Sequence, residues 1–266
     1  MPESPQQPIP SGRDDLYRDP QPPAAFRFDA SVAAVFPDMI SRSVPGYRFN
    51  LELVAAIARR HVQAHSRVYD LGCSLGAMTL SIRSALAGMD APPAGVELIG
   101  VDNSQAMLER ARAQLAAFHS PYRTDLVCAD LAEVLPERAS MVVLAYTLQF
   151  VEPARRDAVI ARLYDGLLPD GVLVLAEKVN EPEPEPGAEA LMTELHHDFK
   201  RANGYSELEI AGKRQALENV LLTETVTNHE DRLRQAGFDE VVMLSRHYGF
   251  CLWLARRCKK TTDQTD

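Results

Sequence analysis

The sequence predicts an α/β fold in which about seven strands form one mostly parallel, doubly wound sheet. Apolar runs alternate with amphipathic segments along most of the chain, as expected for successive βα units. One such run ends at Asp70 and turns through two glycines into a helical segment. The next run ends at Asp102, which places a second acidic side chain at a strand end.

The amino-acid composition argues against several classes of function. The 266 residues carry a net charge of −9 with 46% hydrophobic residues. This supports a sizeable core and argues against a dedicated nucleic-acid binder, because phosphate contacts need an excess of Lys and Arg. The four cysteines form no CxxC pair, so we expect reduced thiols, no zinc knuckle and a cytoplasmic protein. We expect no signal peptide and no membrane span, since no apolar run has the required length.

We expect one domain over residues 25–258 with a disordered segment at each end. Seven prolines among polar neighbours predict a disordered lead over residues 1–24. The polar residues 259–266 predict a frayed tail. Alternating Glu and Pro followed by Gly187 indicate a stiff acidic loop over residues 181–187.

The expected strands are continuous apolar runs, which are typical of a sheet buried on both faces. They lie at residues 68–71, 98–101, 125–129, 141–146 and 172–176, followed by a terminal pair at 241–244 and 250–254. Helices are expected between them. One is capped at Asn103 or Ser104, one starts near Pro153, and one covers residues 229–236 before Gly237.

Residues 188–222 do not fit this alternation. Leu191, Leu195 and Phe199 share one helix face, and the Asn-Gly pair at 203–204 ends that helix. We therefore predict an insertion of two or three helices that covers the carboxyl edge of the sheet and shapes a substrate pocket.

The glycine turn and the acidic strand ends predict a nucleoside site, because glycines admit a ligand close to the backbone and a helix N-terminus presents free N–H groups. An NAD turn needs G-x-G-x-x-G, but Ser74 replaces the middle glycine. The D-x-G-x-S-x-G pattern at residues 70–76 instead resembles the first motif of class I S-adenosylmethionine-dependent enzymes. In that class Asp102 would take the ribose and Asp130 the adenine amino group. A tight turn without a ligand is the alternative.

Further blocks carry a more specific resemblance. Residues 35–47, 147–150 and 196–210 (HHDFKRANGYSELEI) closely resemble the carboxy-S-adenosyl-L-methionine synthases, and the resemblance runs from about Phe28 to Leu254. It implies a Rossmann-like class I SAM-dependent methyltransferase fold. It also implies an enzyme that carboxylates the methyl group of S-adenosyl-L-methionine with prephenate as the carboxyl source, releasing phenylpyruvate. The implied chemistry is a sulfonium ylide that attacks carbon dioxide.

The resemblance also implies partners and residue roles. The product, carboxy-S-adenosyl-L-methionine, would supply a tRNA carboxymethyltransferase that forms 5-oxyacetyluridine at the wobble position. A homodimer is implied, with the 188–222 cover at its interface, and neither a metal nor direct nucleic-acid contact is expected. Arg214 is the implied catalytic residue, which binds the new carboxylate, and Ala145 replaces an Asn that is frequent in the family. With Arg214, the implied cofactor-binding residues are Tyr47, Gly72, Cys73, Ser74, Asp102, Asn103, Asp130 and Leu131.

Several side chains have a second interpretation. Arg214 falls on a helix face with Leu217, where a buried charge needs a partner such as a ligand carboxylate or Glu218. The alternative is a side chain that extends past the apolar face to solvent.

The basic residues Lys200, Arg201, Lys213 and Arg214 could form a patch for anionic prephenate, with a solvated face as the alternative. For Lys200 the solvated face is the preferred interpretation. The adjacent His196 and His197 point to different helix faces, so they cannot chelate one ion together.

Two further side chains carry alternatives. Tyr47 would, without the resemblance, be a core residue, and Cys73 lies where a helix N-terminus could lower its pKa, although we expect a backbone contact from it. Two other functions share the nucleoside site. One is an ordinary methyltransferase of a small molecule or RNA, and the other is a non-catalytic carrier of the carboxylated cofactor.

Overall fold

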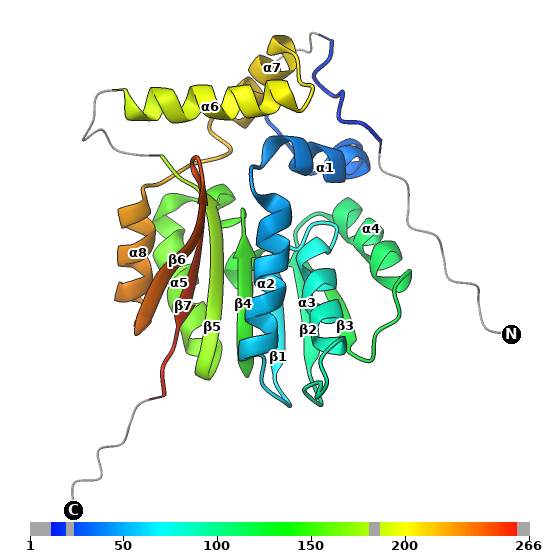
Figure 1. Ribbon diagram of the computed structural model, residues 1–266, viewed down its shortest axis with the longest axis vertical. Coiled ribbons are helices and arrows are strands. Elements are labelled where there is room, and N and C mark those ends of the chain that lie inside the picture. The colour runs from blue at the N-terminus through cyan, green and yellow to red at the C-terminus, as the bar shows by residue number, and fades with distance from the viewer. Residues whose placement is uncertain (1–11, 20–23, 181–186, 260–266) are drawn as a thin grey trace, which may run out of the picture.

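The computed structural model describes residues 12–19, 24–180 and 187–259, which fold around a seven-stranded sheet of order β3-β2-β1-β4-β5-β7-β6 (Figure 1). Strands β1 to β5 are parallel, and β7 runs antiparallel between β5 and β6. The predicted strands are all present, with β5 longer than expected at its N-terminal end. Their bounds are β1 Arg67–Leu71, β2 Glu97–Asp102, β3 Arg123–Cys128, β4 Ala139–Ala145, β5 Leu167–Lys178, β6 Glu240–His247 and β7 Phe250–Arg256.

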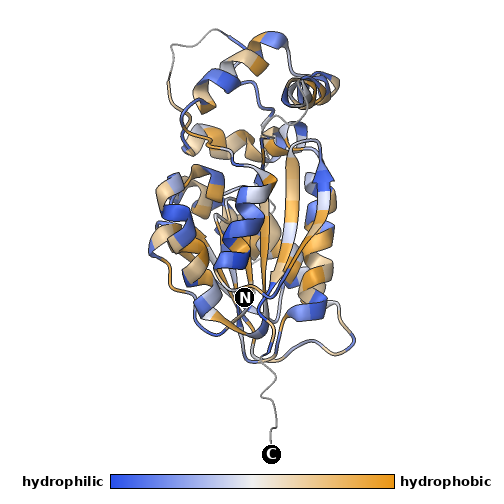
Figure 2. Ribbon diagram, turned by 90° about the vertical axis from the view of Figure 1, so that its left-hand side faces the viewer, coloured by the Kyte–Doolittle hydropathy of each residue, from blue (hydrophilic) through white to orange (hydrophobic). Residues whose placement is uncertain are grey.

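Helices cover both faces of this sheet, as the continuous apolar strands predict. Successive side chains of β4 point to opposite faces. Met141 and Val143 pack in a cluster with α2 and α3, while Val142 and Leu144 pack in a second cluster with α5 and α8. Figure 2 shows the resulting hydrophobic strands between helices with hydrophilic outer surfaces. The bounds are α2 Tyr47–His61, α3 Ala77–Ala87, α4 Gln105–Ala116, α5 Pro153–Gly166 and α8 Val226–Gln235, with short 3-10 helices η1 Leu131–Glu133 and η2 Leu148–Phe150.

Three helices lie over the carboxyl edge of the sheet (Figure 1). They are α1 (Ala30–Ser43), α6 (Ala188–Ala202) and α7 (Glu207–Leu217). The predicted insertion thus contributes two helices, and α6 ends at the predicted Asn-Gly pair, where Gly204 has a φ of +84°. No helix of the described residues is long and apolar enough to cross a membrane.

The N-terminal segment differs from the expectation of a disordered lead. Residues 12–19 are described, and the side chain of Asp14 is only 1% exposed. The physical reason is that Asp14 pairs with a buried lysine, Lys213 of α7. Residues 1–11 and 20–23, residues 181–186 of the predicted acidic loop and residues 260–266 of the tail lie outside the described residues.

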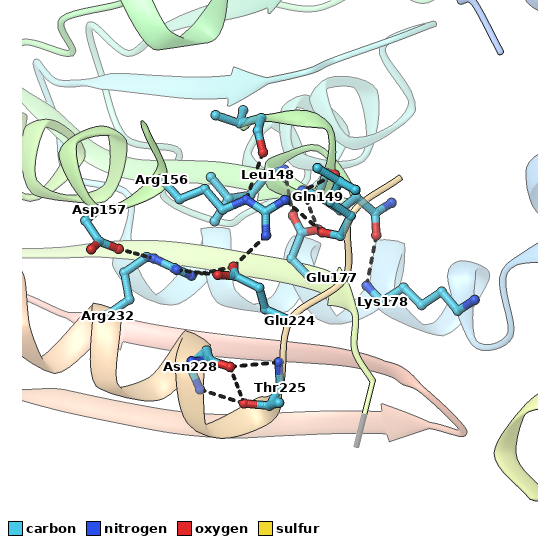
Figure 3. A network of polar contacts seen from close by, with 12 residues as sticks. Leu148, Gln149, Arg156, Asp157, Glu177, Lys178, Glu224, Thr225, Asn228 and Arg232 are labelled. Carbon is cyan, nitrogen blue, oxygen red and sulfur yellow. Dashed lines mark hydrogen bonds and ion pairs between the residues drawn. The ribbon is translucent and has the colours of Figure 1, made fainter. Parts of the chain in front are cut away.

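A buried carboxylate joins the end of β5 to the turn after β4 (Figure 3). Glu177 accepts hydrogen bonds from the backbone N–H groups of Thr147, Leu148 and Gln149 at 3.1, 2.8 and 3.1 Å. Burial raises the pKa of Glu177 to about 8, and the three N–H donors act against that rise. The Gln149 side chain in turn accepts from the backbone N–H of Lys178 at 3.2 Å. The strand end and the turn therefore hold each other in place.

Glu177→Ala removes the acceptor of three N–H groups and should lower the free energy of unfolding by about 3 kcal/mol or more, because each buried donor left unpaired costs roughly 1–3 kcal/mol. Urea unfolding measures this loss. Glu177→Gln keeps the shape and one acceptor oxygen, so its loss should be smaller. An unchanged midpoint for Glu177→Ala would contradict the role given to this carboxylate.

Candidate functional site

A cavity of about 680 Å³ separates the carboxyl edge of the sheet from the helical cover. The ends of β1 to β5 and the turns that follow them contribute to its lining, and α1, α6 and α7 contribute from the other side. Ala145 is among the lining residues. Eight of the nine side chains or loop positions predicted to bind the cofactor line this cavity: Tyr47, Gly72, Cys73, Ser74, Asp102, Asn103, Asp130 and Leu131.

The glycine turn after β1 lies directly against the turn that Glu177 holds. Gly72 has a φ of +76°, and a Cβ placed on it would lie 2.2 Å from Oγ1 of Thr147. Only glycine fits both the backbone conformation and the contact. The loop at residues 72–74 thus takes its position from β4 and β5 as well as from its own strand.

Asp102 bridges the two loops at the nucleoside end. One carboxylate oxygen accepts from the Ser74 N–H at 2.9 Å, and the other accepts from the Ser104 N–H at 2.9 Å. Burial raises the pKa of Asp102. A carboxylate oxygen can accept more than one hydrogen bond, so both oxygens keep capacity for the two hydroxyls of a ribose.

Asp130 and Leu131 lie at the start of η1, beyond the end of β3. The Asp130 side chain accepts from the Ala132 N–H at 2.8 Å, which caps the short helix and fixes the carboxylate. Asp130 lies one strand further along the sheet than Asp102, because β3 is the neighbour of β2. This order suits an adenine next to a ribose.

Asp70 and Cys73 have structural surroundings. Asp70 accepts from the backbone N–H and Oγ1 of Thr79 at 3.0 and 2.6 Å, which holds the first turn of α3. Burial raises the pKa of Asp70 to about 6. Burial, and then the nearby Asp70 and Asp102, raise the pKa of Cys73 instead of lowering it. Cys73 is therefore a protonated thiol, which suits a backbone contact rather than nucleophilic chemistry.

The other part of the cavity is cationic. Lys178 at the end of β5, Lys200 on α6 and Lys213 on α7 all line it. The prediction that Lys200 lies on a solvated face was wrong, because Lys200 is only 9% exposed. The i, i+4 spacing of His196 and Lys200 could have placed both on one inward helix face. Burial, and then the charges of Lys213 and Lys178, lower the pKa of Lys200 to about 7.

His196 supplies a neutral ring beside these lysines. Its Nε2 lies 2.8 Å from the backbone carbonyl oxygen of Ser43. A carbonyl oxygen accepts, so Nε2 carries the proton and Nδ1 presents a lone pair. Burial, and then the charge of Lys200, lower the pKa of His196 to about 3, which keeps the ring uncharged near neutral pH.

Lys213 is held by the N-terminal segment. Its Nζ lies 3.5 Å from Oδ2 of Asp14 and 3.1 Å from Oγ of Ser43. The Tyr205 hydroxyl also donates to Asp14, and the Asp14 N–H donates to Asp38 at 2.7 Å. Burial lowers the pKa of Lys213 to about 8, and Asp14 opposes that lowering. Sequence reasoning missed Asp14, because no local pattern distinguishes it from the exposed acids around it.

The structure places Arg214 differently from the predicted apolar helix face. Arg214 is exposed and is not among the cavity-lining residues, while its neighbour Lys213 takes the buried position between Ile210 and Ala216. Its charge still acts at the cavity, since burial and then Arg214 lower the pKa of Lys178. Arg214 therefore lies outside the lining of the cavity in one copy of the chain, and its predicted role stays a proposal.

The sequence is similar to a known domain family over part of its length and to known proteins over most of it. Residues 68–171 match a family model described as a methyltransferase domain. A carboxy-S-adenosyl-L-methionine synthase of Yersinia enterocolitica is 48% identical over 248 residues, which is 92% of this chain and 91% of that protein. A carboxy-S-adenosyl-L-methionine synthase of Yersinia pestis is 48% identical over 239 residues, which is 90% of this chain and 87% of that protein.

Solved structures share the fold at low identity. Human N-acetylserotonin methyltransferase in complex with SAM has a TM-score of 0.56 at 18% identity, over 86% of this chain and 56% of that one. Magnesium protoporphyrin IX methyltransferase from Synechocystis with bound SAH has a TM-score of 0.55 at 16% identity, over 82% and 87%. These confirm the predicted class I methyltransferase fold.

Asp14→Ala leaves the buried Lys213 without its carboxylate and should lower the free energy of unfolding by about 3 kcal/mol at about pH 7. The loss should shrink toward about pH 10, because the folded protein then holds Lys213 uncharged with or without Asp14. Denaturant unfolding at both pH values measures this. The exposed neighbour Asp15→Ala is the control. Equal stability of the two variants would contradict the pairing.

Proposed function

The chain belongs to the carboxy-S-adenosyl-L-methionine synthases, and from this we propose that it converts S-adenosyl-L-methionine and prephenate to carboxy-S-adenosyl-L-methionine and phenylpyruvate. The nucleoside part of S-adenosyl-L-methionine would bind the 72–74 loop, Asp102–Asn103 and Asp130–Leu131, with Tyr47 against the remainder of the molecule. The proposal needs no metal, and among the described residues no group of three or more His, Cys, Asp or Glu side chains is arranged to hold one.

The observation that carries the proposal is the division of one cavity into an acidic and a cationic part. Asp102 ends β2 and Lys178 ends β5, three strand spacings apart in the sheet, or about 14 Å. A sulfonium ion bound between them would be repelled by the lysines unless an anion intervened. Prephenate is a dianion and meets this condition. A methyltransferase with a neutral acceptor would share the nucleoside part but would not need the lysines.

The chemistry balances without a protein base. Prephenate loses its ring carboxylate as carbon dioxide and its ring hydroxyl as hydroxide, which leaves phenylpyruvate. Hydroxide takes a proton from the S-methyl group and becomes water. The resulting ylide carbon forms a bond to carbon dioxide, which gives the carboxymethyl group. The aromatic wall of Phe28, Phe36 and Phe150, in edge contact at 5.2–6.2 Å, would keep bulk water from both reactive species.

We extend the proposal to the use of the product, the cellular compartment and the oligomeric state. The product would supply a tRNA carboxymethyltransferase that acts on a wobble uridine. The protein itself would make no direct contact with nucleic acid, in line with its net charge of −9. It would act in the cytoplasm as a homodimer, with α6 and α7 at the interface, where a second copy would cover the exposed Arg214.

Mass spectrometry of the ligand carried by freshly purified protein, followed by incubation with S-adenosyl-L-methionine and prephenate, tests the function. We expect a bound species one carboxyl unit heavier than S-adenosyl-L-methionine, and phenylpyruvate formed in step with it. Bound S-adenosyl-L-methionine with prephenate untouched would contradict the proposal and favour the ordinary methyltransferase.

Arg214→Ala tests the carboxylate role of this residue. We expect affinity for carboxy-S-adenosyl-L-methionine to fall roughly tenfold or more, since one charge-assisted hydrogen bond contributes about 1.5–3 kcal/mol. Affinity for S-adenosylhomocysteine, which lacks the carboxylate, should not change. Arg48→Ala, at a side chain 93% exposed on α2, is the control. Titration calorimetry measures both ligands, and equal losses for the two would refute the assignment.

A further inference from the structure

The distribution of lysine in this chain is uneven. Of its 28 lysines and arginines only five are lysines, at positions 178, 200, 213, 259 and 260. Three of the five line the one cavity described above. Arginine serves nearly every other cationic position, including the exposed ion pairs. A compact ammonium on a flexible stem differs from a planar guanidinium in shape and in how it binds a carboxylate. The cavity therefore has its own requirement for lysine.

Two of these three ammonium groups lack a carboxylate in direct contact within the part of the chain that the structure describes. Lys200 and Lys213 are 9% and 7% exposed, and Lys178 is partly buried. Asp14 lies 3.5 Å from Lys213, but among the described residues no carboxylate lies within ion-pair distance of Lys178 or Lys200. Glu189 acts on Lys178 only from beyond that distance, and burial and Arg214 outweigh it. A buried lysine without a partner is rare because the charged form is costly to desolvate. Lys178 and Lys200 are thus the two cations that an anionic ligand would neutralise.

The lysines are held from three different elements. The backbone of Lys178 is bonded to Gln149, and its side chain extends away from the Glu177 network (Figure 3). Phe250 pairs with Lys178 across β5 and β7, and its ring lies 5.0 Å from that of His196, one helical turn before Lys200. Lys178 is thus the strand neighbour of Phe250, and Lys200 lies one helical turn from His196, so the ring contact brings the two lysines into one region of the cavity. The charge of Lys178 accordingly lowers the pKa of Lys200. This neighbourhood suits one anionic group that contacts both.

We infer that Lys178 and Lys200 bind the 2-oxocarboxylate of prephenate, the carboxylate that remains in phenylpyruvate, and thereby direct the ring carboxylate toward the S-methyl group. This inference rests on the proposed function. Lys213 lines the same part of the cavity, but Asp14 already neutralises it, so we do not assign it to the substrate carboxylate.

The choice between the two carboxylates of prephenate follows from the reaction. A carboxylate paired with two ammonium groups is stabilised in the ground state, which opposes its loss as carbon dioxide. The ring carboxylate must leave, so it belongs next to the sulfonium and the apolar wall. The 2-oxocarboxylate keeps its charge throughout, so strong ion pairs can hold it without raising the barrier.

The test uses Lys178→Met and Lys200→Met, which keep the length of the side chain and remove its charge. We expect each to raise the KM for prephenate and the inhibition constant of phenylpyruvate in parallel, by roughly 10–100-fold. The dissociation constant of S-adenosylhomocysteine should stay within about twofold, which also reports a folded site. Lys200→Arg should recover part of the loss. Lys259→Met, at an exposed residue away from the cavity, is the matched control.

A second readout follows from the charge of Lys200. Burial, Lys213 of α7 and Lys178 of β5 lower its pKa to about 7, with His196 uncharged beside it. At about pH 8 the free site then holds Lys200 mostly unprotonated, and binding of a carboxylate should draw in a proton. Lys213, with a pKa of about 8, and Lys178, with a lowered pKa, contribute to the uptake as well. Calorimetry of phenylpyruvate binding to the S-adenosylhomocysteine complex, in two buffers of different ionisation enthalpy, should therefore show proton uptake in the wild type and a clearly smaller uptake in Lys200→Arg.

Three results would overturn the inference. Unchanged constants in both Met variants would show that the lysines bind no substrate. A raised KM for prephenate with an unchanged inhibition constant for phenylpyruvate would place them on the departing carboxylate. A loss of S-adenosylhomocysteine affinity that matches the loss for prephenate would place them on the methionine carboxylate. Absence of turnover in the wild type is a separate result, which would overturn the proposed function itself.

Discussion

The arrangement of this protein depends on positive charge held out of water at the carboxyl edge of a parallel sheet. Ammonium groups there are expensive to desolvate, so each one needs an anion from the protein or from a ligand. Lys213 takes its anion from Asp14, which draws the N-terminal segment onto α7 and links it to α1 through Asp38. Lys178 and Lys200 have no such partner among the described residues. The fold thus supplies one counter-ion, and a second is left to the substrate.

The nucleoside part of the cavity is fixed by a different set of contacts. Glu177 holds the turn after β4, Thr147 of that turn packs on Gly72, and Ser74 of the glycine loop donates to Asp102. These contacts connect β5, β4, β1 and β2 in their spatial order. A change at the buried end of β5 can therefore reach the nucleoside loop through the sheet. The same strand carries Lys178, so β5 positions both parts of the cavity.

Much of this could be predicted from the sequence because it is local. Strands buried on both faces are continuous apolar runs, and the glycine turn and the acidic strand ends repeat at spacings that a βα unit requires. Topology then brings Asp102 and Asp130 to one edge. Lys200 was misjudged as solvated, Asp14 was missed, and Lys213 was named only as part of a possible basic patch. Their burial depends on how α6, α7 and the N-terminal segment pack together, which no local pattern shows. For Arg214 the helix was predicted correctly, but the inward face of α7 carries the preceding residue, Lys213, and leaves Arg214 exposed.

The central claim is that one cavity binds a nucleoside at its acidic part and a 2-oxocarboxylate at its lysines. A crystal structure with S-adenosylhomocysteine and phenylpyruvate bound together tests it most directly. Our account predicts ribose density on Asp102 and the phenylpyruvate carboxylate between the Nζ atoms of Lys178 and Lys200. Phenylpyruvate with its carboxylate elsewhere, and the methionine carboxylate of the cofactor on those lysines, would contradict it.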